Sequence, residues 1–235
     1  MRRGGRGAAA VAKMFAAAGG RFLTKPTALA GRLGAVRALL FDWDGVFTDG
    51  RGGSGFAEAD SMGVNLLRFG FWLRDGKLPP AAIVSGRENP AALEFGDREH
   101  LHAVYTGVGD KRTALGHFRD AYRLAPDQVA AVFDDVNDLA VARECGVRIL
   151  VHRPGGPLFR RSVAAGKLCD YVTANPGSAC AVREAAELML GLMGMFEAVI
   201  DARVASNPSY REYFAQRQSC VTERHAAEDG RLVKR

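Results

Sequence analysis

From residue 36 onward, short apolar runs alternate with longer helix-like segments. The apolar runs are rich in Val, Ile and Ala, as in parallel strands buried on both faces, and occupy residues 36–42, 81–85, 102–106, 129–134, 147–151 and 169–173. The helix-like segments occupy residues 61–74, 88–98, 110–123, 136–145, 157–166 and 178–192. This alternation predicts an α/β fold built on a doubly wound parallel sheet.

In such sheets the functional residues gather at the carboxyl ends of the strands. Asp42, Ser85 and Asp134 each stand at the end of a predicted strand. The first of these ends reads "FDWDGVFTDG" and places Asp44 one residue beyond Asp42. Burying two carboxylates side by side is costly, so this corner predicts a bound cation.

Charge is distributed unevenly along the 235 residues, a length that fits one α/β domain with appendages. The net charge is +6, but the first 37 residues hold eight Arg or Lys residues and no acid, and the remainder carries a net −2. We therefore predict a basic leader over residues 1–35, either a disordered or marginally helical tail or an over-extended start with Met14 as the true initiator. A core over residues 36–192 follows, and then a helical extension with a polar tail over residues 193–235.

Composition also excludes several classes of protein. The leader is too interrupted for a membrane span or a signal peptide. The four cysteines lie far apart without a CxxC pair, which indicates reduced thiols and a cytoplasmic protein. With the predicted core slightly acidic, we expect neither a nucleic acid nor a membrane as partner.

Four short segments, taken in chain order, carry the chemistry. They place carboxylates, a hydroxyl with a following glycine, and a lysine at strand ends or helix starts: "FDWDGVFTDG" (Asp42, Asp44), "IVSGR" (Ser85, Gly86), "GVGDKRTAL" (Lys111) and "AVFDDVNDL" (Asp134, Asp135, Asp138). Phosphoryl transfer needs a nucleophile, positioning groups and charge neutralisation. Carboxylate and carbonyl oxygens are the ligands of Mg²⁺, which we expect as the cofactor.

These segments resemble those of the haloacid dehalogenase (HAD) superfamily of phosphatases. Residues 36–192 are most similar to the 3-deoxy-D-manno-octulosonate 8-phosphate phosphatase (KdsC-like) group, through "DWDGVFTDG", "SGR" and "DYVT…AVREAAELML". The resemblance implies a Rossmann-like HAD core and a phosphatase that works through an aspartyl-phosphate. Because Phe133 replaces the usual glycine, and residues 48–61 are shorter than the group's hairpin, we regard the chain as a divergent member.

The resemblance also implies roles for individual residues. Asp42 would be the nucleophile, and Asp44 the general acid and then the general base. Ser85, Gly86 and Lys111 would hold the phosphoryl oxygens. The metal would be bound by Asp42, the backbone carbonyl of Asp44, and Asp134, with support from Asp135 and Asp138. Asp60 and Arg87 are candidate substrate contacts, although a surface ion pair is an equal alternative for Arg87.

The function predicted on this basis is Mg²⁺-dependent hydrolysis of a small phosphorylated sugar or sugar acid. One alternative is a catalytically weakened HAD-fold binding protein, with Phe133 as the cause. The retained Asp42, Lys111 and Asp134 argue against it. The other alternative, a nucleic-acid end phosphatase, lacks the basic footprint that phosphate-backbone binding needs.

We also predict a homo-oligomer; a tetramer is possible in the resembling group's manner only if the shortened hairpin still builds that assembly. The predicted strands and helices fill the intervals from Asp42 to Ser85 and from Ser85 to Lys111, which leaves no room for an inserted cap domain. A small substrate needs a site closed from water, so a neighbouring subunit or the extension after residue 192 would supply the missing wall. Light scattering that gave a monomer mass together with full activity would contradict the shared site.

Overall fold

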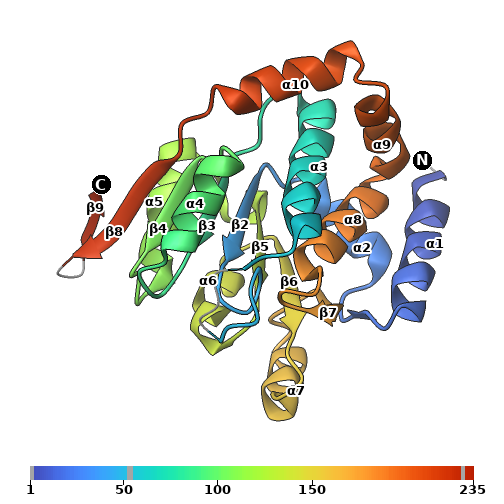
Figure 1. The fold of residues 1–235 in the computed structure, drawn as a ribbon. Helices are drawn as coiled ribbons and strands as arrows, with labels where there is room; N and C mark the ends of the chain where they lie inside the picture. The colour runs from blue at the N-terminus through green and yellow to red at the C-terminus, as the bar shows by residue number, and fades with distance from the viewer. Residues whose placement is uncertain (1–2, 52–54, 229–230) are drawn as a thin grey trace.

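The computed structural model describes residues 3–51, 55–228 and 231–235. Within these residues nine strands form one sheet in the order β1-β7-β6-β5-β2-β3-β4-β8-β9, and its inner neighbours run parallel (Figure 1). The strands are β1 (Arg21–Phe22), β2 (Ala38–Asp42), β3 (Ala81–Val84), β4 (Ala103–Thr106), β5 (Val129–Phe133), β6 (Val147–His152), β7 (Tyr171–Pro176), β8 (Glu223–Glu228) and β9 (Arg231–Lys234).

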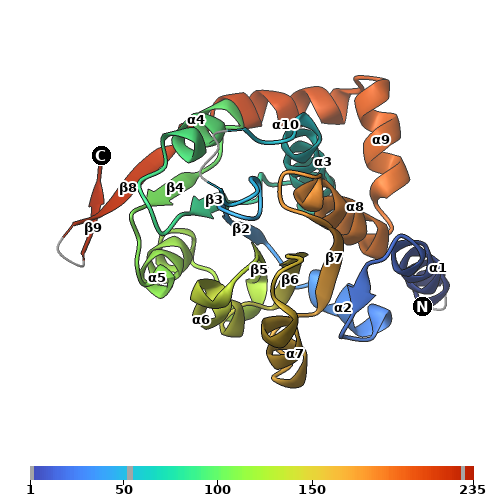
Figure 2. The ribbon, with the colours of Figure 1, turned by 60° about the horizontal axis from the view of Figure 1, so that its bottom comes forward.

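Helices cover both faces of the sheet (Figures 1 and 2). They are α1 (Arg3–Ala17), α2 (Pro26–Leu33), α3 (Glu58–Asp75), α4 (Pro90–Arg98), α5 (Lys111–Tyr122), α6 (Leu139–Arg143), α7 (Pro157–Ala165), α8 (Ala181–Met193), α9 (Phe196–Val204) and α10 (Pro208–Gln218). Two short 3₁₀ turns, η1 (Pro126–Gln128) and η2 (Val136–Asp138), flank β5.

The central strand β2 shows why the sheet is covered on both sides. Successive side chains of a strand point to opposite faces. Leu39 and Phe41 join the core cluster that includes α3 and α8, whereas Ala38 and Leu40 join the cluster that includes α5. All four are buried. The predicted doubly wound parallel sheet is confirmed.

The N-terminal segment is more ordered than the disordered or marginally helical leader that its composition predicted. Residues 3–17 and 26–33 form helices α1 and α2, and β1 pairs antiparallel with β7. Leu29 and Leu33, four residues apart on α2, are both fully buried, and they belong to the core cluster that contains α8 residues. The segment is therefore part of the folded body, because an apolar i,i+4 pair gives it a face to bury.

Asp170, which lies just before β7, ties this segment to the sheet. Its carboxylate is fully buried and accepts hydrogen bonds from Thr24 Oγ1 (2.7 Å) and Arg32 Nη1 (2.7 Å). It also accepts from the backbone N–H of Arg148 (2.9 Å) and from that residue's guanidinium, with Nη2 at 3.0 Å. One buried charge thus fixes residues that are far apart in the sequence.

The C-terminal segment is also more ordered than the predicted polar tail. The helical extension is present as α9 and α10, but residues 223–228 and 231–234 then form a hairpin. Strand β8 pairs parallel with β4 and extends the sheet. In Figure 1, α10 runs across the end of the molecule opposite to the loop that follows β2. Within the part of the chain that the structure describes, no helix is long and apolar enough to cross a membrane.

We predict that Asp170→Asn destabilises the fold and loosens the N-terminal segment. Breaking a buried ion pair by removing one partner costs about 3–5 kcal/mol, and the amide keeps part of the hydrogen bonding. We therefore expect the free energy of unfolding to fall by at least about 2 kcal/mol in urea denaturation. Trypsin should also cleave faster near Arg32. The exposed Asp201 supplies the control Asp201→Asn; equal stability of the two variants would contradict the assignment.

Candidate active site

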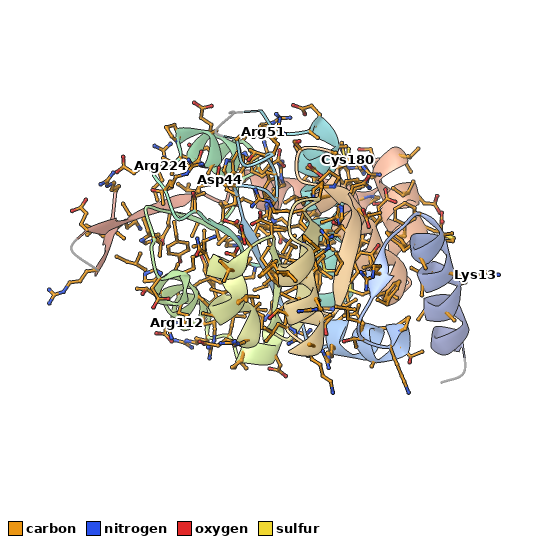
Figure 3. The ribbon with its side chains drawn as sticks, turned by 90° about the horizontal axis from the view of Figure 1, so that it is seen from below. Lys13, Asp44, Arg51, Arg112, Cys180 and Arg224 are labelled. Carbon is orange, nitrogen blue, oxygen red and sulfur yellow. The ribbon has the colours of Figure 1, made fainter. Side chains whose placement is uncertain are left out.

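The predicted strand ends converge at one edge of the sheet. Asp42 ends β2, Ser85 follows β3, and Asp134 follows β5, and these strands are neighbours in the order β5-β2-β3. Figure 2 brings this edge forward, and Figure 3 views the molecule from it, with Asp44 on the near face and Lys13 of α1 far to one side. The structure thus brings together the three strand ends at which the sequence places these residues.

Lys111 links two of the carboxylates. Its Nζ lies 2.5 Å from Asp42 Oδ1 and 2.6 Å from Asp138 Oδ1. All three side chains are at most 7% exposed. Lys111 is the first residue of α5, which begins at the N-cap Asp110, whose carboxylate accepts from the backbone N–H of Arg112. The helix start therefore aims the ammonium at the end of β2.

Three buried carboxylates lie together here, and two of them bond the ammonium of Lys111. Asp42, Asp134 and Asp138 each offer an oxygen atom, and these atoms all lie within 4.8 Å of one another. Burial, followed by the negative charge of Asp138, raises the pKa of Asp42 well above its ordinary value. Burial likewise raises the pKa of Asp134 to about 6. Such a set of hard oxygen donors with excess negative charge fits a divalent cation such as Mg²⁺.

The carboxylate of Asp44 is held apart from this cluster, on the side of β3. It accepts from Arg87 Nη2 (3.0 Å) and from Asn89 Nδ2 (3.3 Å), and its side chain is 24% exposed. Of the two alternatives left open for Arg87, the structure contains the ion pair. Asp44 is thus positioned over the loop after β3 by two donors, and its carboxylate stays partly open to a ligand.

Ser85 and Gly86 form the start of the loop after β3. The backbone N–H of Ser85 donates to Tyr105 O (2.8 Å), and its carbonyl accepts from the backbone N–H of Val108 (3.1 Å). The Ser85 hydroxyl is buried and accepts from the backbone N–H of Arg87 (3.3 Å), whereas Gly86 is exposed. The loop is therefore fixed to the end of β4, with its glycine at the surface.

Asp60 does not join the site as a substrate contact. Its side chain is fully buried, and Oδ1 accepts from the backbone N–H of Arg183 (2.8 Å) in the first turn of α8. Burial raises the pKa of this carboxyl to about 6. With no exposed surface, Asp60 has no face for a substrate. The favourable partner of a buried acid here is a helix N-terminus, and that tertiary contact was not readable from the sequence.

Phe133 and Asp135 lie at the end of β5. From the sequence, Phe133 is the residue expected to weaken the site, whereas Asp135 is expected to support the metal. Phe133 packs with Leu150 and Val163 in a buried cluster beside α6 and α7, and it also lines a small cavity that Asp42, Lys111 and Asp138 share. Asp135 is the N-cap of η2 and accepts from the backbone N–H of Val136 (2.7 Å). It also accepts from Arg153 Nη1 (3.1 Å).

Sequence reasoning missed Arg153. It directly follows β6, and its Nη1 lies 2.7 Å from Asp134 Oδ2. The rule that selected Asp42, Ser85 and Asp134, a polar residue at the carboxyl end of a parallel strand, would also have selected Arg153. Asn89, the second donor to Asp44, had no comparable signal in the sequence.

Two glycines of the loop after β2 make room for these groups. Gly45 and Gly50 have φ values of +85° and +75°, which disfavour other residues. A Cβ atom at Gly45 would lie 2.0 Å from Asp134 Oδ2, and one at Gly50 would lie 2.9 Å from Arg153 Nη2. The loop can pack against Asp134 and Arg153 only because both positions lack a side chain. Residues 43–51 and 55–57 contain no strand, and residues 52–54 of the expected short hairpin lie outside the described residues.

Comparison with known proteins relates the chain to one group of phosphatases. No family model matches it. The 3-deoxy-D-manno-octulosonate 8-phosphate phosphatase KdsC of Escherichia coli is 28% identical over 164 residues, which cover 69% of this chain and 83% of that protein. The KdsC protein of Yersinia pestis is 27% identical over 161 residues, covering 68% and 82%.

Solved structures agree with this relation. A crystal structure of the phosphatase from Yersinia pestis has a TM-score of 0.58 and 28% identity, covering 72% of this chain and 88% of that one. The phosphatase from Moraxella catarrhalis, in complex with a magnesium ion, a phosphate ion and KDO, has a TM-score of 0.62 and 26% identity, covering 75% and 98%.

The raised pKa of Asp134 predicts how the stability of the metal-free protein depends on pH. The folded protein keeps a proton that the unfolded chain releases, so this stabilisation is complete below a pH of about 3.8 and is lost as the pH rises through about 6. Asp134→Asn, which mimics the neutral acid, should escape this loss. In urea denaturation with EDTA, we expect the variant to gain stability relative to wild type across that window. Parallel profiles would show that Asp134 ionises normally.

Proposed function

We propose that this chain, a divergent KdsC-like member of the haloacid dehalogenase superfamily, is a Mg²⁺-dependent phosphatase that acts on a small phosphorylated sugar or sugar acid. The observation that carries the proposal is the ion-paired triad of Asp42, Lys111 and Asp138 beside Asp134, buried at the carboxyl ends of β2 and β5. A carboxylate nucleophile, a fixed ammonium and a metal-binding acid are the parts that phosphoryl transfer requires.

In the proposed reaction, a carboxylate oxygen of Asp42 attacks the phosphorus atom. The bond from phosphorus to the leaving oxygen breaks, Asp44 gives that oxygen its proton, and an aspartyl-phosphate forms. Water then attacks the phosphorus, Asp44 takes the proton from the water, and inorganic phosphate leaves with Asp42 restored. Lys111 neutralises charge on the phosphoryl oxygens throughout. A divalent cation held by Asp42, Asp134 and the Asp44 carbonyl would supply further charge neutralisation.

Arg87 is bonded to the carboxylate of Asp44, the proposed general acid. Its Nη2 lies 3.0 Å from Asp44 Oδ1. The guanidinium is 63% exposed, so it is free to move from Asp44 to an anionic or hydroxyl group of the substrate. Substrate binding would then release Asp44 to act as the general acid.

The substrate class is supported by the relatives rather than by the geometry. The E. coli and Y. pestis relatives are named for 3-deoxy-D-manno-octulosonate 8-phosphate, and the M. catarrhalis structure contains KDO. The nucleic-acid alternative is less well supported. Although the basic N-terminal residues belong to the folded body, Figure 3 places Lys13 of α1 far from Asp44.

A neighbouring subunit is the proposed source of the missing wall. The C-terminal helices do not serve as a lid in this structure, because α10 packs on α3, where Tyr213 Oη donates to Asn65 O (3.0 Å). The end of the hairpin lies closer to the site, since Arg235 Nη1 contacts Glu88 Oε1 at 3.3 Å in the loop after β3. Homo-oligomerisation and a cytoplasmic location remain predictions.

Asp42→Asn should abolish phosphate release without unfolding the protein. The amide conserves volume but is no nucleophile, so we expect at least about a 10³-fold loss of kcat. The assay is phosphate release from sugar, sugar-acid and nucleotide phosphates, with and without Mg²⁺. The control is Asp49→Asn, an exposed acid of the same loop. Near wild-type turnover by Asp42→Asn would exclude the covalent mechanism.

A further inference from the structure

Arg153 places a fixed positive charge on a carboxylate that the proposed metal also needs. Its Nη1 bonds Asp134 Oδ2 at 2.7 Å and Asp135 Oδ2 at 3.1 Å. Asp134 is 2% exposed and belongs to the three-carboxylate cluster. A guanidinium therefore already neutralises part of the charge that would attract a cation.

The position of Arg153 is built into the fold and does not result from a loose surface contact. Its guanidinium lies against the backbone of the loop after β2, where a Cβ at Gly45 would come within 3.4 Å of Nη1 and one at Gly50 within 2.9 Å of Nη2. Its backbone carbonyl accepts a hydrogen bond from Arg160 of α7. Contacts with Asp134, Asp135, Gly45 and Gly50 thus fix the position of the Arg153 side chain.

The guanidinium also has space into which it can move. Arg153 is 40% exposed and lines a cavity of about 270 Å³. Arg51 and Asp49 of the loop after β2 line the same cavity, together with His152. A cation that binds Asp134 can therefore displace Arg153 toward this cavity without unfolding any element.

We propose that Arg153 is an internal counter-cation that competes with divalent metal for the Asp134 carboxylate and so weakens metal binding. The inference rests on the metal site of the proposed function. Mg²⁺ must approach a carboxylate oxygen to about 2.0–2.1 Å. If Arg153 stays in place, two like-charged groups a few ångströms apart repel each other. If it leaves, its two bonds are lost; in both cases the free energy of metal binding becomes less favourable.

The competition has a signature that a purely structural role lacks. In the metal-free protein Arg153 stabilises a buried carboxylate, so its removal should lower the melting temperature. In saturating metal the cation takes over that role, so the melting temperatures of wild type and variant should converge. An arginine that only supported the fold would lower both melting temperatures equally.

The test compares Arg153→Gln with wild type, using MgCl₂ as the titrant in calorimetry and thermal unfolding in EDTA and in saturating Mg²⁺. The matched control is Arg51→Gln, which removes the same charge from the same cavity, where Arg51 is 88% exposed and faces Asp49 at 3.8 Å. We expect Arg153→Gln to tighten Mg²⁺ binding on the order of tenfold and Arg51→Gln to change it less than about twofold.

Each of the other outcomes would overturn one or both proposals. Unchanged or weaker binding by Arg153→Gln would overturn the competition while leaving the proposed function intact, and equal tightening by Arg51→Gln would reduce the effect to general charge. If neither wild type nor Arg153→Gln bound Mg²⁺, both proposals would fall. Should Arg153→Gln not fold, Arg153→Lys keeps the charge but carries it on a shorter side chain, further from Asp134, and it should tighten binding by a smaller factor; no tightening would overturn the inference.

Discussion

The interaction on which the site depends is the contact of one buried ammonium with two buried carboxylates. Lys111 bonds both Asp42 and Asp138, yet Asp134 places a third acid in the same group. Even with Arg153 bonded to Asp134, two positive charges face three negative ones in a medium of low dielectric constant. The folded chain therefore needs either protons, as the raised pKa values of Asp42 and Asp134 indicate, or further cations. The loops around the strand ends are arranged to provide further cations.

Much of the fold could be predicted because local pattern and tertiary role agree in the core. The strands β2 to β5 are short and buried throughout, β6 is mostly buried and β7 is half buried, and the sequence predicts each of them to within a few residues. The outer strands had no such pattern: β8 reads "ERHAAE" and forms because the open edge of β4 offers backbone partners. In the same way, α1 and α2 lie in a segment whose Gly, Ala and Arg content indicates disorder. They are held by tertiary contacts such as Arg32 with Asp170.

The residues of the site also divide into those that could be predicted from the sequence and those that could not. Residues at strand ends, such as Asp42 and Asp134, could be predicted because topology brings the carboxyl ends of parallel strands together. Asp60 could not be placed, because whether an acid faces a ligand or a helix N-terminus depends on the packing of α3 against α8. Phe133 is a similar case, since its effect depends on which face of β5 it occupies, and it occupies the face that packs on α7.

Three of the cations at this edge are each bonded to an acid of the proposed machinery. Lys111 holds Asp42, Arg87 holds Asp44, and Arg153 holds Asp134. They differ in exposure: Lys111 is 7% exposed, whereas Arg153 is 40% and Arg87 63% exposed. A buried lysine cannot leave without stranding two carboxylates, whereas the two partly exposed arginines have room to exchange their partners for ligands. It follows that Lys111 sets the geometry of the nucleophile permanently. Arg87 instead neutralises the general acid Asp44 until substrate takes its place, and Arg153 neutralises the metal-binding acid Asp134 until the metal does. A site without an inserted cap would in this way stay electrostatically balanced while open to water.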